Sequence, residues 1–163
     1  MFAAYLPAGQ TVTYVLNQRH FRCLELGPIA PGATLNLGAN AQMVGQLTSP
    51  NRAAFAGSGG VITGTNLLIS ADTNGTTAGW GGSIQGTGLF YNKAGSTSAN
   101  YYNDNTYTGP TLITGGTLTL IDEGRLSGTS SIAVNGATFA INDIGTVQMG
   151  DRVNNAASIT LRG

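Results

Sequence analysis

Three short runs of alternating apolar and polar residues, each about twenty residues after the last, constrain the fold of this chain most. The runs are Thr-Leu-Thr-Leu at 117–120, Thr-Phe-Ala-Ile at 138–141 and Ser-Ile-Thr-Leu at 158–161. Alternation with a period of two is typical of a half-buried β-strand. We therefore predict a strand at each run and expect the three strands to be equivalent parts of a repeat.

A second strand fits inside each repeat. The segments 112–114 and 131–134 precede the first two runs, and the pairs Gly115-Gly116 and Asn135-Gly136 lie between the strands. Such pairs favour positive φ and mark sharp corners. A period near 20 residues with two or three short strands is typical of one coil of a β-solenoid, in which equivalent strands of successive coils pair in parallel.

This repeat predicts an all-β fold, a parallel β-helix of about 20-residue coils. Residues 1–163 are expected to form a single β-helical segment, less regular in 1–104 and clearly repeated in 105–163. No window favours a helix, because Gly and β-branched residues interrupt each candidate. Side chains one coil apart should stack about 4.8 Å from each other. The expected columns are Leu118, Phe139 and Ile159, and Leu120, Ile141 and Leu161.

The first half is expected to continue the series with less obvious spacing. Strand-like runs occur at 12–16, 21–26, 33–37, 61–62, 67–69 and 89–91. The Gly- and Thr-rich segment 70–88, around Trp80, has two possible interpretations. It is either a loop or a loosely patterned coil.

Composition supports a packed, charge-poor protein. Charged residues make up 9% of the chain, against roughly 25% in ordinary domains, while 41% of the residues are hydrophobic, which argues against disorder. The net charge is zero and no basic patch occurs, so nucleic acid is not an expected partner. No run approaches the ~18 apolar residues of a membrane span.

The two ends of the chain suggest a piece of a longer array. Residues 1–7 lack the basic and apolar regions of a signal peptide. The chain stops at Gly163, directly after the last strand-like run. We interpret this as a cut inside a longer array, and expect flanking repeats or another copy to cover the terminal coils. An isolated, well-behaved monomer is therefore not expected.

The clearest repeats resemble a known sequence family. The segment 105–109 reads Asn-Thr-Tyr-Thr-Gly and is followed at 111–120 by a strand and a Gly-Thr-Leu strand. This order resembles the passenger-associated repeat of bacterial autotransporters. The segments 134–139 and 151–161 are similar to later elements of tandem copies. Residues 89–95 are similar to the Leu-x-Lys-x-Gly segment that precedes the turn, with the order altered, and Pro110 replaces a common Gly.

This resemblance implies a right-handed β-helix at the bacterial cell surface, associated with the outer membrane and exported through a β-barrel that would lie outside this chain. It implies a structural or adhesive passenger stalk, and no catalytic residue. The expected partners are neighbouring copies or flanking repeats, with surface glycans or host proteins as further candidates. A self-assembling subunit of an extracellular filament or surface layer is the alternative, and a β-helical polysaccharide-cleaving enzyme is the weaker one.

Few residues suggest metal or nucleophilic chemistry. His20 and Cys23 are three positions apart, which would place them on opposite faces of one strand, so a structural role is favoured over zinc. Asp104 lies in an Asn-Asp-Asn segment that offers oxygen ligands for calcium but lacks the rest of a binding loop. A Ser–His–Asp triad would have to use His20, which is remote from any suitable serine. We therefore predict no metal site, no cofactor and no catalytic residue.

Carboxylates and aromatic residues give two further hypotheses. Asp122 and Asp143 are one repeat apart, as a glycosidase pair would require, but a position at exposed corners without a groove between them is favoured. A lyase would add basic residues such as Lys93 or Arg125. Aromatic residues gather in 90–107, namely Phe90, Tyr91, Tyr101, Tyr102 and Tyr107. Tyrosines at the surface could bind sugars or another protein, and the alternative is that Phe90 and Tyr107 stack inside the coil.

Overall fold

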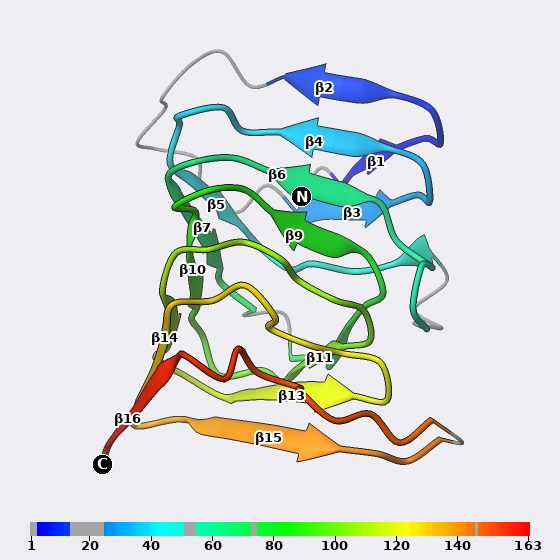
Figure 1. Cartoon of the computed structure of the whole chain (residues 1–163). Coiled ribbons are helices and arrows are strands. Elements are labelled where there is room, and N and C mark those ends of the chain that lie inside the picture. Colours follow the sequence, from blue (N-terminus) through cyan, green and yellow to red (C-terminus); the bar gives the residue numbers. More distant parts are fainter. Residues whose placement is uncertain (1–2, 14–24, 51–54, 73–74, 146) are drawn as a thin grey trace.

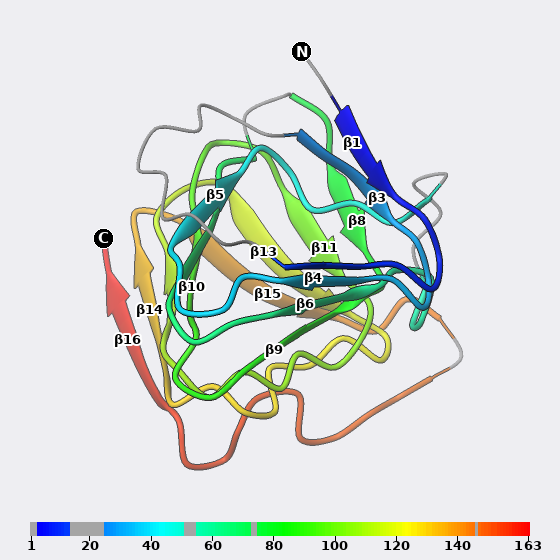
Figure 2. The same cartoon turned by 90° about the horizontal axis from the view of Figure 1, so that it is seen from above.

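The chain folds into a parallel β-solenoid of about five turns, each of about 22 residues. The computed structural model describes residues 3–13, 25–50, 55–72, 75–145 and 147–163, and all regular structure in them is β. Figure 1 shows the turns stacked from β2 to β15 and β16, and Figure 2 shows the strands arranged around the perimeter. The predicted fold class is confirmed, with coils slightly longer than the expected twenty residues.

Parallel strands form four sheets in the described residues. The six-stranded sheet contains, in spatial order, β16 (Ser158–Arg162), β14 (Ser131–Asn135), β12 (Thr111–Ile113), β10 (Phe90–Lys93), β7 (Leu67–Ser70) and β5 (Gln42–Val44). The β8–β15 sheet contains β15 (Thr138–Asn142), β13 (Thr117–Ile121), β11 (Ala99–Tyr101) and β8 (Ala78–Trp80). The β2–β9 sheet contains β2 (Thr11–Thr13), β4 (Thr34–Asn36), β6 (Val61–Thr63) and β9 (Ser83–Gln85), and a two-stranded sheet contains β1 (Ala3–Leu6) and β3 (Glu25–Ile29).

The chain visits three faces in turn. From β6 to β11 it passes through the β2–β9 sheet, the six-stranded sheet and the β8–β15 sheet, and then repeats this path. In the next coil the segment 105–109 takes the place of a strand on the first face. The Asn105 side chain is buried there, and its Oδ1 accepts a hydrogen bond from the backbone N–H of Ile84 at 3.0 Å. An amide side chain thus satisfies backbone groups where strand pairing stops.

Inward-facing side chains stack in register to form the core. Leu118 pairs with Phe139 and Leu120 with Ile141, as the repeat predicts. The third member of each predicted column is wrong, because β16 pairs with β14 rather than with β15. Ile159 therefore stacks on Ile132, and Leu161 stacks on Val134. The long connection between β15 and β16 crosses the remaining face, which shifts β16 to the six-stranded sheet.

The segment 70–88 is a regular part of the solenoid. It contains β8 and β9, and Trp80 is fully buried. The interpretation of this segment as a coil is therefore correct. Of the strands expected in the first half, β2 (Thr11–Thr13) overlaps the start of the run at 12–16. The rest of that run and most of the run at 21–26 lie within residues 14–24, outside the described part of the chain.

Candidate functional site

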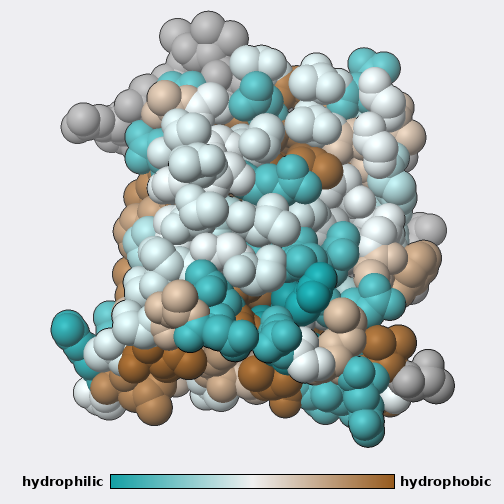
Figure 3. All heavy atoms as spheres, in the orientation of Figure 1, coloured by the Kyte–Doolittle hydropathy of each residue, from teal (hydrophilic) through white to brown (hydrophobic). Residues whose placement is uncertain are grey.

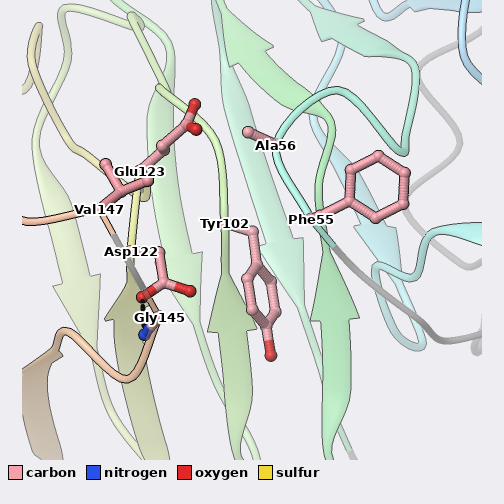
Figure 4. A pocket seen from close by; sticks show the side chains of 7 residues that line it. All are labelled: Phe55, Ala56, Tyr102, Asp122, Glu123, Gly145 and Val147. Atoms are coloured by element: carbon pink, nitrogen blue, oxygen red, sulfur yellow. Dashed lines mark hydrogen bonds between the residues drawn. The ribbon is translucent and has the colours of Figure 1, made fainter.

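A groove of about 240 Å³ lies at the corner where the strands of the β8–β15 sheet end. Its lining residues are Phe55, Ala56, Tyr102, Asp122, Glu123, Gly145 and Val147. Tyr102 directly follows β11 and Asp122 directly follows β13, while Gly145 lies three residues after β15. Successive coils therefore contribute to the groove in order. Figure 4 shows the Tyr102 ring between Asp122 on one side and Phe55 on the other.

Asp122 is held in one position by its backbone and by a neighbouring turn. Its φ is +50°, in the left-handed region that non-glycine residues seldom adopt. Its Oδ1 accepts a hydrogen bond from the Gly145 N–H at 2.7 Å. A Cβ at Gly145 would lie 2.8 Å from the other carboxylate oxygen, so a larger residue there would displace the Asp122 side chain. Oδ2 makes no hydrogen bond to the described residues, and the same is true of the Glu123 carboxylate.

Phe55 is presented by a tight turn. The Ser58 N–H donates to the Phe55 carbonyl oxygen at 3.0 Å, and the Phe55 N–H donates to Ser58 Oγ at 3.1 Å. The turn is fixed to the end of β8, where the Gly57 N–H donates to the Gly81 carbonyl oxygen at 2.8 Å. The Phe55 side chain nevertheless remains 66% exposed. A rigid backbone thus carries a large apolar ring into solvent at the rim of the groove.

The aromatic cluster expected from the sequence is divided between core and surface. Tyr91, Tyr101 and Tyr107 are fully buried, whereas Phe90 is half-buried. Tyr102 is also half-buried, and it is the member of the cluster that lines the groove. Its backbone N–H donates to the Trp80 carbonyl oxygen at 2.9 Å, which fixes the position of its Cα. The surface hypothesis therefore applies to Tyr102, and the stacking hypothesis to the three buried tyrosines.

The two carboxylates that were candidates for glycoside cleavage have different surroundings. Asp122 lines the groove, but Asp143 is not among its lining residues. Asp143 forms an ion pair with Arg152, whose Nε donates to the Gly124 carbonyl oxygen at 2.7 Å. Neither Lys93 nor Arg125 lines the groove. The acidic neighbour that accompanies Asp122 is instead Glu123.

Lys93 lies inside the solenoid, where the repeat would place an apolar residue. It is fully buried, and in the six-stranded sheet it stacks between Ser70 and Ile113. The three N–H groups of its ammonium lie within hydrogen-bonding distance of four backbone carbonyl oxygens, those of Ala94 (3.1 Å), Gly95 (3.1 Å), Thr97 (2.5 Å) and Gly115 (3.0 Å), so at least one N–H is shared. The Asp72 carboxylate lies 3.7 Å away. Lys93 therefore closes the turn after β10 from within, and connects it to the next coil.

A chain of hydroxyl groups continues from this ion pair. Ser70 Oγ donates to Asp72 Oδ2 at 2.7 Å and contacts the Tyr91 hydroxyl at 2.7 Å, and the Tyr101 hydroxyl donates to that of Tyr91. Burial raises the pKa of Asp72 to about 6 despite the opposing effects of Ser70 and Lys93. Burial, with the Asp72 charge, raises the pKa of Tyr91 and Tyr101 well above the usual value. Both phenols therefore stay neutral and serve as donors.

Other sequence candidates are separate from the groove. His20 and Cys23 lie outside the described residues. The Asp104 carboxylate forms an ion pair with Arg125 of the next coil, with 2.9 Å between Oδ2 and Nη2. Among the described residues, His, Cys, Asp and Glu form no group of three that could hold a metal ion.

Sequence reasoning missed both the groove and the interior ion pair. The groove has no linear motif, because its residues come from turns of different coils, which are separated by about 20 to 46 residues. A signal for the ion pair was present, since Lys93-Ala94-Gly95 belongs to the altered Leu-x-Lys-x-Gly segment. Gly95 has a φ of +78°, and a Cβ there would lie 1.6 Å from the Ala71 carbonyl oxygen. The spacing of lysine and glycine thus reflects a turn that the ammonium group closes.

Comparison of the chain with protein-family models, with curated proteins and with solved structures gives no match. Within the described residues, no helix has the length and apolar character needed to cross a membrane.

Proposed function

We propose that this chain is a structural segment of a surface-exposed β-solenoid, with a role in spacing and adhesion like that of an autotransporter passenger stalk, and that it is not an enzyme. The observation that carries the proposal is that its charged side chains connect successive coils. Three of the four described cations connect one coil to the next, namely Lys93, Arg125 and Arg152. Charges placed in this way stabilise the stacking of coils, which is what an extended stalk requires.

The anions support the same function. Asp104 and Asp143 are each paired with an arginine, and Asp72 faces Lys93 in the interior. Glycoside cleavage would need two carboxylates on opposite sides of one substrate bond. Asp122 and Glu123 are instead adjacent in sequence at one corner of the groove.

The test uses intact cells that produce the protein. An antibody against this chain should label unpermeabilised cells, and external protease should remove the signal. Deletion of the gene should reduce adhesion, and the gene carrying Met43→Ala, a change in β5 outside the groove and the last coil, should restore it. Protection of the chain from protease until the cells are lysed would contradict the proposal.

A second candidate function is end-to-end assembly of copies, and the last coil favours it. Ile141, Ile159 and Leu161 are 51%, 55% and 77% exposed, and the outer edges of β15 and β16 pair with no described strand. Figure 3 shows hydrophobic residues gathered at this end of the molecule. Unpaired strand edges and an apolar end are the features that recruit a further strand.

Sedimentation velocity of the isolated chain at increasing concentration tests this assembly. Wild type should associate, and Leu161→Lys should remain monomeric because a charge replaces the most exposed apolar residue of β16. Ile144→Lys is the matched control, because Ile144 is similarly exposed, at 67%, but lies outside the strands. Equal association of wild type and Leu161→Lys would exclude assembly through this end.

A further inference from the structure

We propose that the groove at the end of the β8–β15 sheet binds a neutral glycan, with Tyr102 and Phe55 against the sugar rings and Asp122 and Glu123 accepting hydrogen bonds from hydroxyl groups. The inference does not depend on the surface location proposed above, because it concerns binding by the isolated chain. Four features of the groove carry it.

The first feature is the presentation of the rings. Tyr102 begins immediately after β11, and Phe55 lies on a turn hydrogen-bonded to the end of β8. Both backbones are therefore fixed before any ligand arrives. An aromatic ring offers a large apolar face, and Tyr adds a polar tip, at a small cost in conformational entropy. The C–H face of a sugar ring is a suitable partner for such a surface.

The second feature is a set of acceptors without partners. Asp122 is oriented through Oδ1 by the Gly145 N–H, which leaves Oδ2 available, and Glu123 has no hydrogen bond to the described residues. The available carboxylate oxygens suit a ligand that donates hydrogen bonds, as hydroxyl groups do.

The third feature is charge. Within the described part of the chain, the lining residues include two carboxylates and no Lys, Arg or His. The nearest arginine in sequence, Arg125, is already paired with Asp104. An acidic polysaccharide or a phosphate would therefore be repelled, because like charges at close range disfavour binding. The groove selects an uncharged, hydroxyl-rich ligand.

The fourth feature is shape. At about 240 Å³ the groove is smaller than the pockets of roughly 300–1,000 Å³ that enclose drug-sized ligands. Its walls come from the ends of successive strands, which lie about 4.8 Å apart along the solenoid axis. This arrangement suits a linear chain that lies along the axis and inserts about one ring between Tyr102 and Phe55.

Isothermal titration calorimetry on the full chain tests the proposal. The probes are maltohexaose, cellohexaose and mannohexaose as neutral glycans, hexagalacturonate as the acidic counterpart, and hexalysine as a basic peptide. We expect at least one neutral probe to bind at millimolar concentration or below, and hexagalacturonate not to bind. Tyr102→Ala and Phe55→Ala should each weaken binding about tenfold.

The controls separate binding from folding. Tyr102→Phe keeps the ring and should bind nearly as wild type does, whereas Glu123→Gln should bind more weakly because it replaces a charged acceptor with a neutral one. Met43→Ala changes an exposed apolar residue of β5 that does not line the groove and should have no effect. Each variant is checked by its far-UV circular dichroism spectrum and its unfolding midpoint.

Three results would overturn the proposal. These are no binding of any neutral probe, unchanged binding by Tyr102→Ala, or tighter binding of hexagalacturonate than of the neutral probes. If hexalysine is the probe that binds and Tyr102→Ala abolishes this binding, the ligand of the groove is a basic protein rather than a glycan. This result would also reject the proposal. Protease protection on intact cells would reject the surface function without affecting any of these measurements.

Discussion

Tyr101 and Tyr102 are neighbours in the sequence but belong to two different regions of the molecule. Tyr101 is the last residue of β11, stacks on Trp80 and donates to the hydroxyl of Tyr91 inside the core. Tyr102 follows the strand and lines the groove. Because successive side chains of a strand point to opposite faces, one step along the chain separates a packing residue from a candidate binding residue.

The acidic residues of the two regions differ in the same way. Asp72 is fully buried, and the hydrogen bonds and charge around it come from Ser70 and Lys93 of the same chain. Asp122 and Glu123 keep carboxylate oxygens that no described residue uses. The polar groups of the interior thus bond mainly to one another, whereas the carboxylates of the groove remain available to a partner from outside. Each prediction below tests this difference.

The largest expected effect is on the buried ammonium group. Lys93→Met should reduce the free energy of unfolding by about 3–5 kcal/mol, because the Asp72 charge and four carbonyl oxygens lose their buried partner. Equilibrium urea unfolding measures the change. Arg125→Met is the matched control and should cost about 1 kcal/mol or less, because the Arg125–Asp104 pair is partly exposed, at 31% and 25%. Equal losses in the two variants would contradict the distinction between interior and surface charges.

The second effect concerns pH. The pKa of Asp72 is about 6 in the folded chain, above its ordinary value of 3.8, so the folded state binds this proton more tightly than the unfolded state does. The contribution of protonated Asp72 to the free energy of unfolding is fully present below pH 3.8 and is lost as pH rises through about 6. The difference between the two pKa values corresponds to about 3 kcal/mol.

Asp72→Asn removes this titration and isolates its contribution. The stability of wild type relative to Asp72→Asn should fall by up to about 3 kcal/mol between pH 4 and pH 7. Urea unfolding at several pH values gives the difference curve, and Asp104→Asn serves as the control at a partly exposed ion pair. A flat difference curve for Asp72→Asn would show that Asp72 keeps its ordinary pKa in the core.

The sequence predicted the interior better than the groove, and the reason is physical. Alternation identified the columns that pair Leu118 with Phe139 and Leu120 with Ile141, because burial imposes a period of two on every strand. It did not predict that Ile159 stacks on Ile132, because the length of the preceding connection decides which face a strand joins. The groove was missed because it forms from turn residues, which the two-residue alternation of the strands does not govern.

Phe139→Ala has an intermediate expected effect. A fully buried Phe would cost about 3–5 kcal/mol on truncation to Ala, as a complete stack would require. Phe139 is only half-buried, because β15 is the outermost strand of its sheet. We therefore expect about half that loss, about 2 kcal/mol, in urea unfolding. Leu118 pairs with Phe139 and is fully buried, so Leu118→Ala should reduce the free energy of unfolding at least as much, although Leu is smaller than Phe. A larger loss for Phe139→Ala than for Leu118→Ala would show that β15 is covered in solution.

The smallest expected effect on stability is at Tyr102. Tyr102→Ala should change the free energy of unfolding by no more than about 0.5 kcal/mol, because surface substitutions away from buried networks seldom do more. The control is the adjacent Tyr101→Ala, which removes a buried ring and the hydroxyl partner of Tyr91 and should cost about 3–5 kcal/mol. Both values come from the same urea titration. If Tyr102→Ala destabilises the chain as much as Tyr101→Ala does, the ring at the groove is part of the packing. If the difference is as large as predicted, Tyr102 is not needed for folding, and its place beside Phe55 and two unpaired carboxylates is free to serve binding.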